Sequence, residues 1–545
     1  MSRGSDASPP PDHAFPGAET ATPDLVQWAK VIDHTRCIAC HACTVACKSE
    51  NEVPLSVTRT YVKHVEVGSF PRVRRAYQVT RCNQCADAPC VTACPTSAMF
   101  KRSDGIVDFD KEACIGCKAC IAACPYDAIF VNPEDHSAEK CNFCAHRIDM
   151  GLEPACVVVC PTEAILVGNL HDPDSRVARL IHGDAVQVRR PEKETRPTLF
   201  YKGAHQATLD PLAARRPGGG LFAYSEQPNG ADAVPSGHPE GQGPWNSSAA
   251  ALLTYDVAHK VPWDFRVSLY TWTKGMASGI YLVAVGLLLA GFLTASDPLW
   301  LVGVPVVAGL FMVATSALLV WDLEHPKRFL YIFLRPQWRS WLVRGGVILT
   351  LFGLLLALHF GAGVLGHEGL TAALAWAGVP FAVLTAIYTA YLFAQARARD
   401  LWQNPMLPGH FLVQAVLAGA AILLLLGAGT GWAVPGQGAG AGLLGVSSGS
   451  DLAAPLLLVL AGASAAHLLL VAGEVTLTHG TAHVRLAVSE MVRGRHRKTF
   501  WAGTALGIVG LLAPWIGVWA GLPALVGLVL YEHAYVQAGQ SVPLA

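Results

Sequence analysis

Sixteen cysteines constrain this chain more than any other feature, because all of them lie between residues 37 and 160 of 545. They form four groups of four: Cys37, Cys40, Cys43 and Cys47; Cys82, Cys85, Cys90 and Cys94; Cys114, Cys117, Cys120 and Cys124; and Cys141, Cys144, Cys156 and Cys160. The first and third groups share the spacing C-x2-C-x2-C-x3-C, while the middle gap widens to four residues in the second group and eleven in the fourth. A proline follows the last cysteine of groups two, three and four.

This spacing is typical of iron–sulfur cubes. In two-cluster bacterial ferredoxins, three closely spaced cysteines bind three corners of one cube, and the fourth cysteine reaches a neighbouring cube. Proline after the fourth cysteine fixes the backbone as it leaves the cluster, and it has no N–H group to leave unpaired. Sixteen thiolates therefore suit four [4Fe–4S] clusters with none left over.

Disulfide bonds and zinc binding explain this cysteine pattern less well. A disulfide framework suits a small secreted domain rather than four tight repeats of one spacing. Structural zinc needs four ligands in two pairs and no C-x2-C-x2-C run.

Composition divides the chain into two halves. Charged residues and cysteines lie mostly before residue 265, and long apolar runs follow it, in a chain that is 52% hydrophobic and 15% charged. We expect a disordered tail over residues 1–24, which shows no signal peptide, then a cluster domain over 25–203, a Gly/Pro/Ser-rich linker over 204–260 and a transmembrane domain over 261–545. Because the net charge is zero, the chain has no overall positive electrostatic field that would attract nucleic acid.

The apolar runs after Trp263 are long enough to span a bilayer. They predict eight helices, near residues 273–294, 299–321, 342–363, 371–394, 410–430, 453–473, 499–516 and 520–538. Lys and Arg are concentrated in the loops after the second, fourth and sixth helices, which the positive-inside rule places in the cytoplasm. With eight spans, both termini and the cluster domain lie on the cytoplasmic side of the inner membrane.

The cysteine stretches CIACHACTVACKSENEVP, RCNQCADAPCVTACP, CIGCKACIAACPYDAI and KCNFCAHRIDMGLEPACVVVCP resemble the four-cluster iron–sulfur subunit of molybdopterin-dependent oxidoreductases. That family includes the electron-transfer subunits of polysulfide, dimethyl sulfoxide, tetrathionate and nitrate reductases. The resemblance implies that group one shares its cubes with group four, and group two with group three. The implied ligand sets are Cys37, Cys40, Cys43 and Cys160; Cys47, Cys141, Cys144 and Cys156; Cys82, Cys85, Cys90 and Cys124; and Cys94, Cys114, Cys117 and Cys120.

The second half resembles the NrfD/polysulfide-reductase family of membrane anchors, whose members react with quinone. WDFRVSLYTWTKGMASGIY, DLEHPKRF and the closing YEHAYVQAGQSVPLA carry this resemblance. The fold class expected is thus an α+β ferredoxin-like four-cluster domain followed by an all-α bundle of eight transmembrane helices.

Polar and ionisable residues gather at the cytoplasmic ends of the expected helices, where a quinone would need a hydrogen-bond donor and a proton donor. The candidates for quinone contact are Tyr270, Lys274, Asp322, His325 and Tyr388. Helix ends at a membrane interface also carry such residues for structural reasons. His359 and His467 lie deeper, and we expect them to be satisfied core histidines rather than members of a proton path.

The function expected is electron transfer between the membrane quinone pool and a partner catalytic subunit of the molybdopterin type, through four [4Fe–4S] clusters. Two alternatives stay open. The helices could move protons and conserve energy, or they could be a passive membrane anchor for a ferredoxin domain.

Overall fold

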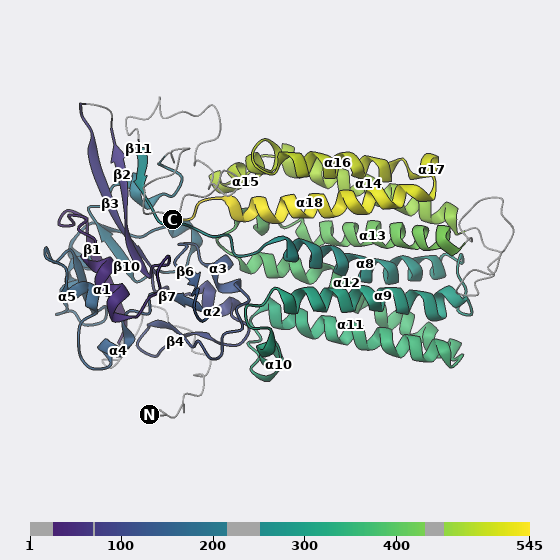
Figure 1. Ribbon diagram of the computed structural model, residues 1–545, viewed down its shortest axis with the longest axis horizontal. Coiled ribbons are helices and arrows are strands. Elements are labelled where there is room, and N and C mark those ends of the chain that lie inside the picture. The colour runs from purple at the N-terminus through teal and green to yellow at the C-terminus, as the bar shows by residue number, and fades with distance from the viewer. Residues whose placement is uncertain (1–25, 69–70, 215–250, 431–451) are drawn as a thin grey trace.

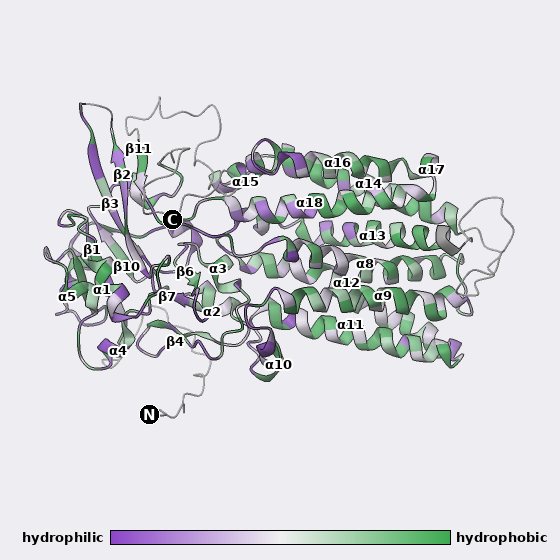
Figure 2. Ribbon diagram, in the orientation of Figure 1, coloured by the Kyte–Doolittle hydropathy of each residue, from purple (hydrophilic) through white to green (hydrophobic). Residues whose placement is uncertain are grey.

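The computed structural model describes residues 26–68, 71–214, 251–430 and 452–545. A domain of mixed strands and short helices comes first, and long helices follow it (Figure 1). Figure 2 shows that the long helices are largely hydrophobic, whereas hydrophilic residues are spread through the N-terminal domain. The predicted tail over residues 1–24 lies outside the described residues.

Four small sheets build the N-terminal domain. The first has the strand order β8–β1–β10–β9, in which β1 runs parallel to β10 and antiparallel to β8. The second has the order β11–β2–β3, and β4–β5 and β6–β7 are two-stranded hairpins. The strands are β1 (Trp28–Asp33), β2 (Thr60–Val67), β3 (Arg74–Arg81), β4 (Met99–Lys101), β5 (Val107–Phe109), β6 (Ile129–Val131), β7 (Ala138–Lys140), β8 (Ile165–Asn169), β9 (Val186–Gln187), β10 (Leu199–Lys202) and β11 (Ala251–Tyr255).

Short helices carry many of the cysteines and pack in pairs. α1 packs against α5, and α2 packs against α3, so cysteine group one meets group four and group two meets group three. The helices of this domain are α1 (Ala42–Glu50), α2 (Pro89–Ala93), α3 (Ala119–Ala123), α4 (Ala145–Ile148), α5 (Ala155–Val158), α6 (Arg176–Gly183) and α7 (Gln206–Leu209). Cysteine side chains of all four groups lie within the hydrophobic clusters of the domain.

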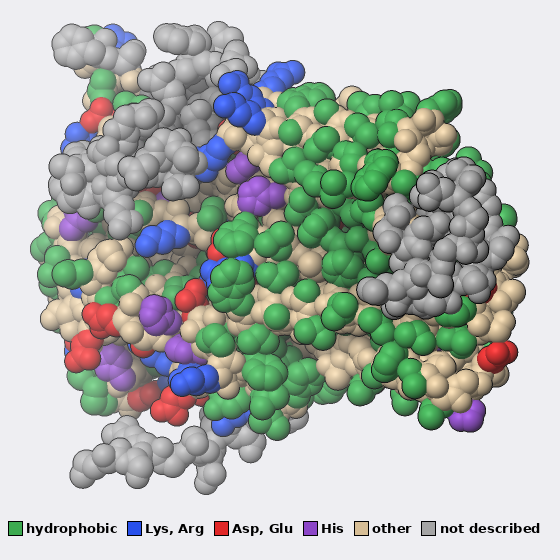
Figure 3. Space-filling view, turned by 45° about the vertical axis from the view of Figure 1, so that its right-hand side comes forward, with side chains coloured by type: hydrophobic (Ala, Val, Ile, Leu, Met, Phe, Trp, Pro, Cys, Tyr) green, Lys and Arg blue, Asp and Glu red, His purple; other side chains and the backbone are tan. Residues whose placement is uncertain are grey.

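The helical half is a bundle in which α8 is central, because it packs against α9, α12, α13 and α18. Its main helices are α8 (Phe265–Leu289), α9 (Val304–Trp321), α11 (Trp341–Val364), α12 (Glu368–Gln395), α13 (Leu407–Thr430), α14 (Ala453–Thr476), α16 (Arg497–Leu511) and α18 (Gly521–Ser541). A π-helical turn at Leu299–Gly303 leads into α9, and the short helices α10 (Tyr331–Leu334), α15 (Ala482–Val492) and α17 (Ala513–Ile516) lie between the long ones. On the face that Figure 3 shows, this half is largely hydrophobic, and most Lys, Arg and acidic side chains lie nearer the N-terminal domain.

Six helices of the described residues are long and apolar enough to cross a membrane. The last of the six is α14, so the prediction of eight spans is confirmed only for the first six. α16 has 15 residues, fewer than the 20 or so that a bilayer needs. α18 has 21 residues but carries Glu532 and His533. α8 begins at Phe265, eight residues before the predicted start, because Asp264 caps the helix there by accepting a hydrogen bond from the backbone N–H of Arg266.

The predicted linker over residues 204–260 contains secondary structure near both ends. α7 lies at its start, and β11 near its end pairs with β2. Residues 215–250 are outside the described part of the chain.

The halves are joined by several contacts besides the chain itself. Arg189 donates to the carbonyl oxygen of Leu544 at 3.1 Å, so the C-terminal residues lie against the N-terminal domain (Figure 1). His259, between β11 and α8, lies between two carboxylates: its Nδ1 is 2.5 Å from Asp127 and its Nε2 is 3.1 Å from Asp256. Burial lowers the pKa of His259, but the charges of Asp256 and Asp127 outweigh it and raise the pKa from 6.5 to about 9.

We expect this histidine to make the joint between the halves sensitive to alkaline pH. Because the pKa is raised in the folded state, the stabilisation is complete below pH 6.5 and disappears as pH rises through 9. Its size is roughly 3 kcal/mol for such a shift. Thermal unfolding in detergent between pH 6 and 10 measures it: the native chain should lose stability across this window, and His259→Gln should be less stable at pH 6 with a flatter profile. Parallel profiles for the two proteins would contradict the assignment.

Candidate functional site

Each cysteine group begins with the same backbone device. The residue just before the second cysteine has a positive φ: Ala39 at 56°, Gln84 at 48°, Gly116 at 69° and Phe143 at 67°. This left-handed conformation is costly for a residue with a Cβ atom. It turns successive backbone N–H groups toward one point, which makes a concavity for an anion such as an iron–sulfur cluster. Four independent loops therefore share a backbone shape that suits the same ligand.

The structure brings the sixteen cysteines into four sets. Most thiols that lie near one another belong to the sets that the family resemblance implies, and across sets Cys43 also lies near Cys156 and Cys82 near Cys141. We call them site 1 (Cys37, Cys40, Cys43, Cys160), site 2 (Cys47, Cys141, Cys144, Cys156), site 3 (Cys82, Cys85, Cys90, Cys124) and site 4 (Cys94, Cys114, Cys117, Cys120). All four cysteines of site 4 line one pocket, and all four of site 1 line another.

The competing uses of cysteine do not fit this geometry. All sixteen cysteines are free thiols. No three Cys, His, Asp or Glu side chains among the described residues converge as ligands of a single metal ion. A zinc ion needs such convergence, with ligand atoms about 2.0–2.3 Å away. A cube takes one thiolate on each of four irons, so the sulfurs of a set stay apart.

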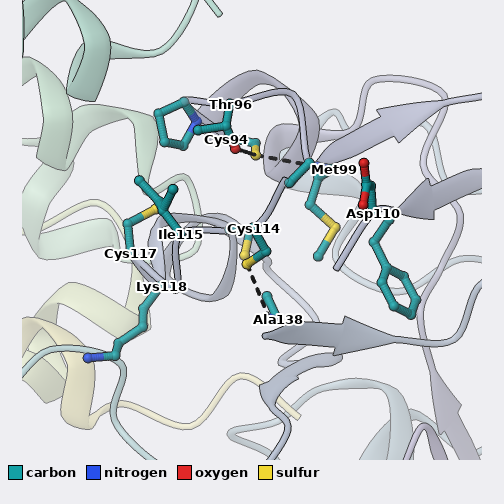
Figure 4. A pocket seen from close by; sticks show the side chains of 14 residues that line it. Cys94, Thr96, Met99, Asp110, Cys114, Ile115, Cys117, Lys118 and Ala138 are labelled. Carbon is teal, nitrogen blue, oxygen red and sulfur yellow. Dashed lines mark hydrogen bonds between the residues drawn. The ribbon is translucent and has the colours of Figure 1, made fainter. Parts of the chain in front are cut away.

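Backbone N–H groups already donate to some of these sulfurs. Figure 4 shows site 4, where Met99 donates to Cys94 Sγ at 3.3 Å and Ala138 donates to Cys114 Sγ at 3.4 Å. At site 1, Ala164 donates to Cys160 Sγ at 3.2 Å. Such hydrogen bonds favour a thiolate and tune the potential of a cluster.

Some of the buried cations near the cysteines lack a carboxylate counterion. Lys30 and Arg81 are each 2% exposed, and neither has a carboxylate partner among the described residues. Removing an unpaired cation from water costs several kcal/mol. A cube bound by four thiolates is an anion, so clusters in these sites would supply the charge that the protein lacks. The donor set, the loop shape and the unpaired cations thus all fit iron–sulfur clusters.

The four sites form a series that begins at the helical half. Site 4 touches it directly: Trp263 Nε1 donates to the carbonyl oxygen of Cys117 at 3.2 Å, and Arg328 donates to that of Cys114 at 2.9 Å. Lys118 forms an ion pair with Glu324 at 2.9 Å, and in Figure 4 its side chain points away from the cysteines toward the helices. Site 1 is at the other end, where Cys40 is exposed.

Three of the predicted quinone residues lie together beyond site 4. Lys274 is fully buried and donates to Ala386 O and Thr389 Oγ1, both at 2.8 Å. Its Nζ lies 5.0 Å from the centre of the Tyr388 ring. Tyr270 is 3% exposed, and its hydroxyl has no hydrogen-bond partner among the described residues. Buried donors without a full set of partners are what a quinone carbonyl would use.

The other two predicted residues lie at the junction with the N-terminal domain. Asp322 follows α9, and its carboxylate is 3.5 Å from Lys118 Nζ. Burial raises the pKa of Asp322 to about 6, although Lys118 opposes the shift. His325 donates its backbone N–H to Ile115 O at 3.2 Å, so this residue lies against the loop of site 4.

The structure adds buried groups that the sequence analysis did not select as quinone contacts. Glu532 is 4% exposed, accepts from Thr271 at 2.8 Å and interacts electrostatically with Lys274. Glu474 accepts from Tyr531 at 2.6 Å, and His410 lies 2.9 Å from His467. The signal available in the sequence was an acidic residue within an apolar helix, but which helices meet is a property of the tertiary structure.

Comparison with known proteins agrees with this geometry. Residues 73–170 match the family model of a 4Fe-4S dicluster domain, and residues 255–521 match that of polysulphide reductase, NrfD. Over 194 residues the sequence is 44% identical to the B subunit of the tetrathionate reductase of Salmonella typhimurium, an alignment that covers 35% of this chain and 77% of that protein. The chain belongs to this family of reductase iron–sulfur subunits.

Two further relatives of the iron–sulfur subunit family show the same pattern. The B component of the polysulfide reductase of Wolinella succinogenes is 40% identical over 177 residues, which are 32% of this chain and 93% of that protein. The B subunit of the selenate reductase of Mesobacillus selenatarsenatis is 36% identical over 209 residues, which are 32% of this chain and 72% of that protein. In the present member, an NrfD domain follows the iron–sulfur domain, and its described residues include six helices apolar and long enough to cross a membrane, so the chain is a multi-pass membrane protein.

Proposed function

We propose that this protein carries electrons between a membrane quinone and a catalytic partner through four [4Fe–4S] clusters, one in each of sites 1 to 4. A quinol gives up two electrons and two protons, and each cube accepts one electron at a time. The helical half would bind the quinone at Tyr270, Lys274 and Tyr388, with Asp322 and His325 between it and the clusters. The sixteen cysteines would hold the clusters, which supply the one-electron chemistry.

One observation carries this proposal: site 4 contacts the helical half beside a buried group of polar side chains. Trp263, which donates to Cys117 O, comes just before α8, the helix that holds Tyr270 and Lys274. Buried ionisable residues within a membrane-spanning helix are costly and mark functional sites. A passive anchor would need neither a buried lysine nor Glu532 next to it.

The far end of the series offers a place for the partner. Around site 1 the surface exposes large apolar side chains, with Ile38 58% exposed, Val45 66% and Val158 62%. Apolar patches of this kind on an otherwise polar domain mark protein–protein contacts. The named relatives are subunits of tetrathionate, polysulfide and selenate reductases, so the partner proposed is a catalytic oxidoreductase subunit of the molybdopterin type.

We further propose that the protein lies in the inner membrane with the iron–sulfur domain on the cytoplasmic side. The basic loops support this orientation. Arg335 and Arg339 flank Gln337, whose backbone N–H donates to Pro95 O of the iron–sulfur domain. Arg397 follows Gln395, which donates to Arg339 O, so these arginines share the end of the bundle nearest that domain. The positive-inside rule would place this end in the cytoplasm.

Proton movement across the membrane is a second candidate function. The buried pairs His410–His467 and Glu474–Tyr531 favour it, because they extend the polar group deeper into the bundle. His359 does not continue this line: it lies against the rings of Tyr281 and Trp300, and neither of its ring nitrogens has a partner among the described residues. The electron relay is therefore the better supported function.

The direct test is anaerobic reduction of the purified protein by a quinol analogue, followed by electron paramagnetic resonance (EPR) and iron analysis. We expect about sixteen irons per chain, since each cube holds four, and a cubane signal that grows when quinol is added. Dithionite serves as the control donor, because it reduces clusters without a quinone site. Far fewer irons would overturn the cluster assignment, while clusters reduced by dithionite but not by quinol would favour a passive anchor or electron flow toward quinone.

A further inference from the structure

We propose that Arg81 and Lys30 are positioning residues that make the cluster of site 2 the most easily reduced of the four. This inference rests on the proposed iron–sulfur function and goes beyond it, because it ranks the clusters and names the side chains that set the rank. The inference follows from the positions of the buried positive charges of the N-terminal domain relative to the four sites.

Arg81 reaches site 2 from the end of β3. Its Nη1 donates to Cys156 Sγ at 3.0 Å. Nε and Nη2 have no hydrogen-bond partner among the described residues, and the side chain is 2% exposed. Its charge also acts on Cys43 of site 1 and Cys141 of site 2.

Lys30 approaches the same site from β1. Its ammonium group is buried, lies 3.8 Å from the centre of the Phe143 ring and has no hydrogen-bond partner among the described residues. Phe143 lies between Cys141 and Cys144 in the sequence, so the ring holds Lys30 beside the loop of site 2. The lysine charge acts on Cys144 and Cys156 of that site and on Cys82 of site 3.

Neither cation is neutralised by the protein. The buried carboxylate Glu139 is bound by Arg59 and by Lys111, each at 2.9 Å. At site 4 the situation is the opposite, because the cation Lys118 is paired with Glu324 at 2.9 Å and with Asp322 at 3.5 Å. Site 3 has one uncompensated cation, Lys140, which is fully buried. Among the described residues it donates only to the carbonyl oxygens of Val107 and Cys141, and it acts on Cys82 and Cys90. Site 2 has two uncompensated positive charges, one of them hydrogen-bonded directly to a cysteine sulfur, and at site 4 the charge of Lys118 is cancelled.

The consequence for reduction follows from Coulomb's law. Reduction adds one negative charge to the cube, and a nearby buried cation stabilises that charge far more than a solvated one does. Two uncompensated cations raise the reduction potential of the nearest cluster, whereas a neutralised one leaves it almost unchanged. Electrons that enter at site 4 would thus settle at site 2 before they leave through site 1.

The test is a redox titration of the full-length protein followed by EPR, with the potential of each cluster as the readout. We expect Arg81→Gln to make one cluster at least tenfold harder to reduce, which is about 59 mV for a one-electron couple. Lys30→Gln should lower the potential of the same cluster. The titrated signal is assigned to site 2 if it is the one lost or altered in Cys144→Ser.

Two further variants separate charge from other effects. Arg74→Gln is the matched control, because Arg74 is an exposed arginine at the other end of β3. Its loss should leave all four potentials unchanged. Arg81→Lys keeps the charge, so the potential should fall less than in Arg81→Gln, and a full fall would show that the hydrogen bond to Cys156 matters rather than the charge.

Two results would overturn the inference at native iron content. One is unchanged potentials in both Arg81→Gln and Lys30→Gln, and the other is an equal shift of all four clusters. If Arg81→Gln loses iron, the potential of the site 2 cluster in Lys30→Gln and Arg81→Lys tests the inference instead. Absence of iron from the native protein would instead refute the proposed function itself.

Discussion

Replacing Lys274 with methionine is expected to slow the reduction of the clusters by quinol about 100-fold, the effect of removing one preorganised donor at a site of developing charge. Methionine has a similar length, so the packing of α8 should survive. The side chain is fully buried, and its Nζ lies 4.6 Å from the Phe411 ring and 5.0 Å from that of Tyr388. The ammonium group, together with Glu532, is the buried charge that a quinone oxygen would meet.

The measurement is the rate of cluster reduction by a quinol analogue, compared with the rate given by dithionite. Lys327→Met is the matched control, because Lys327 is an exposed lysine at the edge of the helical half that faces the iron–sulfur domain. The control should keep the native rate, and both variants should keep full iron content and dithionite reduction. A native rate in Lys274→Met would remove the buried lysine from the quinone site and favour a passive anchor.

Gly279→Ala is expected to destabilise the helical half by about 3 kcal/mol, the upper end of the usual cost of overpacking. Gly279 lies where α8 crosses α13, and an added Cβ atom would clash with the backbone oxygen of Ala415 and lie 2.9 Å from the backbone nitrogen of Gly419. Small residues at such crossings let two helices approach closely in a membrane. Backbone atoms cannot rotate away, so the helices would have to separate.

The control for this variant lies in the same helix. Gly286 is exposed, and a Cβ atom there would meet nothing within 4 Å. Gly286→Ala should therefore leave thermal stability in detergent unchanged or raise it by up to about 1 kcal/mol through helix propensity. Equal melting temperatures for the two variants would show that the close crossing of α8 and α13 does not limit stability.

Several features of the site were predictable because their physical cause is local. The four residues of a cysteine group are close in the chain, and the left-handed residues at Ala39, Gln84 and Phe143 belong to the same short loops. The apolar runs of the first six spans likewise reflect the thickness of a bilayer, which acts on each segment separately.

The last two of the eight predicted spans are not confirmed, because their sequences are the least typical of a membrane-spanning helix. α16 is short and α18 is rich in polar residues, and both pack against neighbouring helices rather than standing alone. The predicted quinone residues divide for a similar reason. Tyr270 and Lys274 are one helical turn apart and lie together, whereas His325 comes after the end of α9, and its backbone is bonded to the loop of site 4.

The sequence by itself determined the kind of cofactor and the division into an iron–sulfur half and a membrane half, because ligand type, spacing and hydrophobic length are properties of short segments. The tertiary structure alone decided which buried charges have partners. In the sequence Arg81 and Lys30 look like ordinary strand residues, and Lys118 is one more basic residue next to a cysteine. Only the folded chain shows that Lys118 meets Glu324 while the other two meet no carboxylate among the described residues, since electrostatic energy depends on distances between groups that are far apart along the chain.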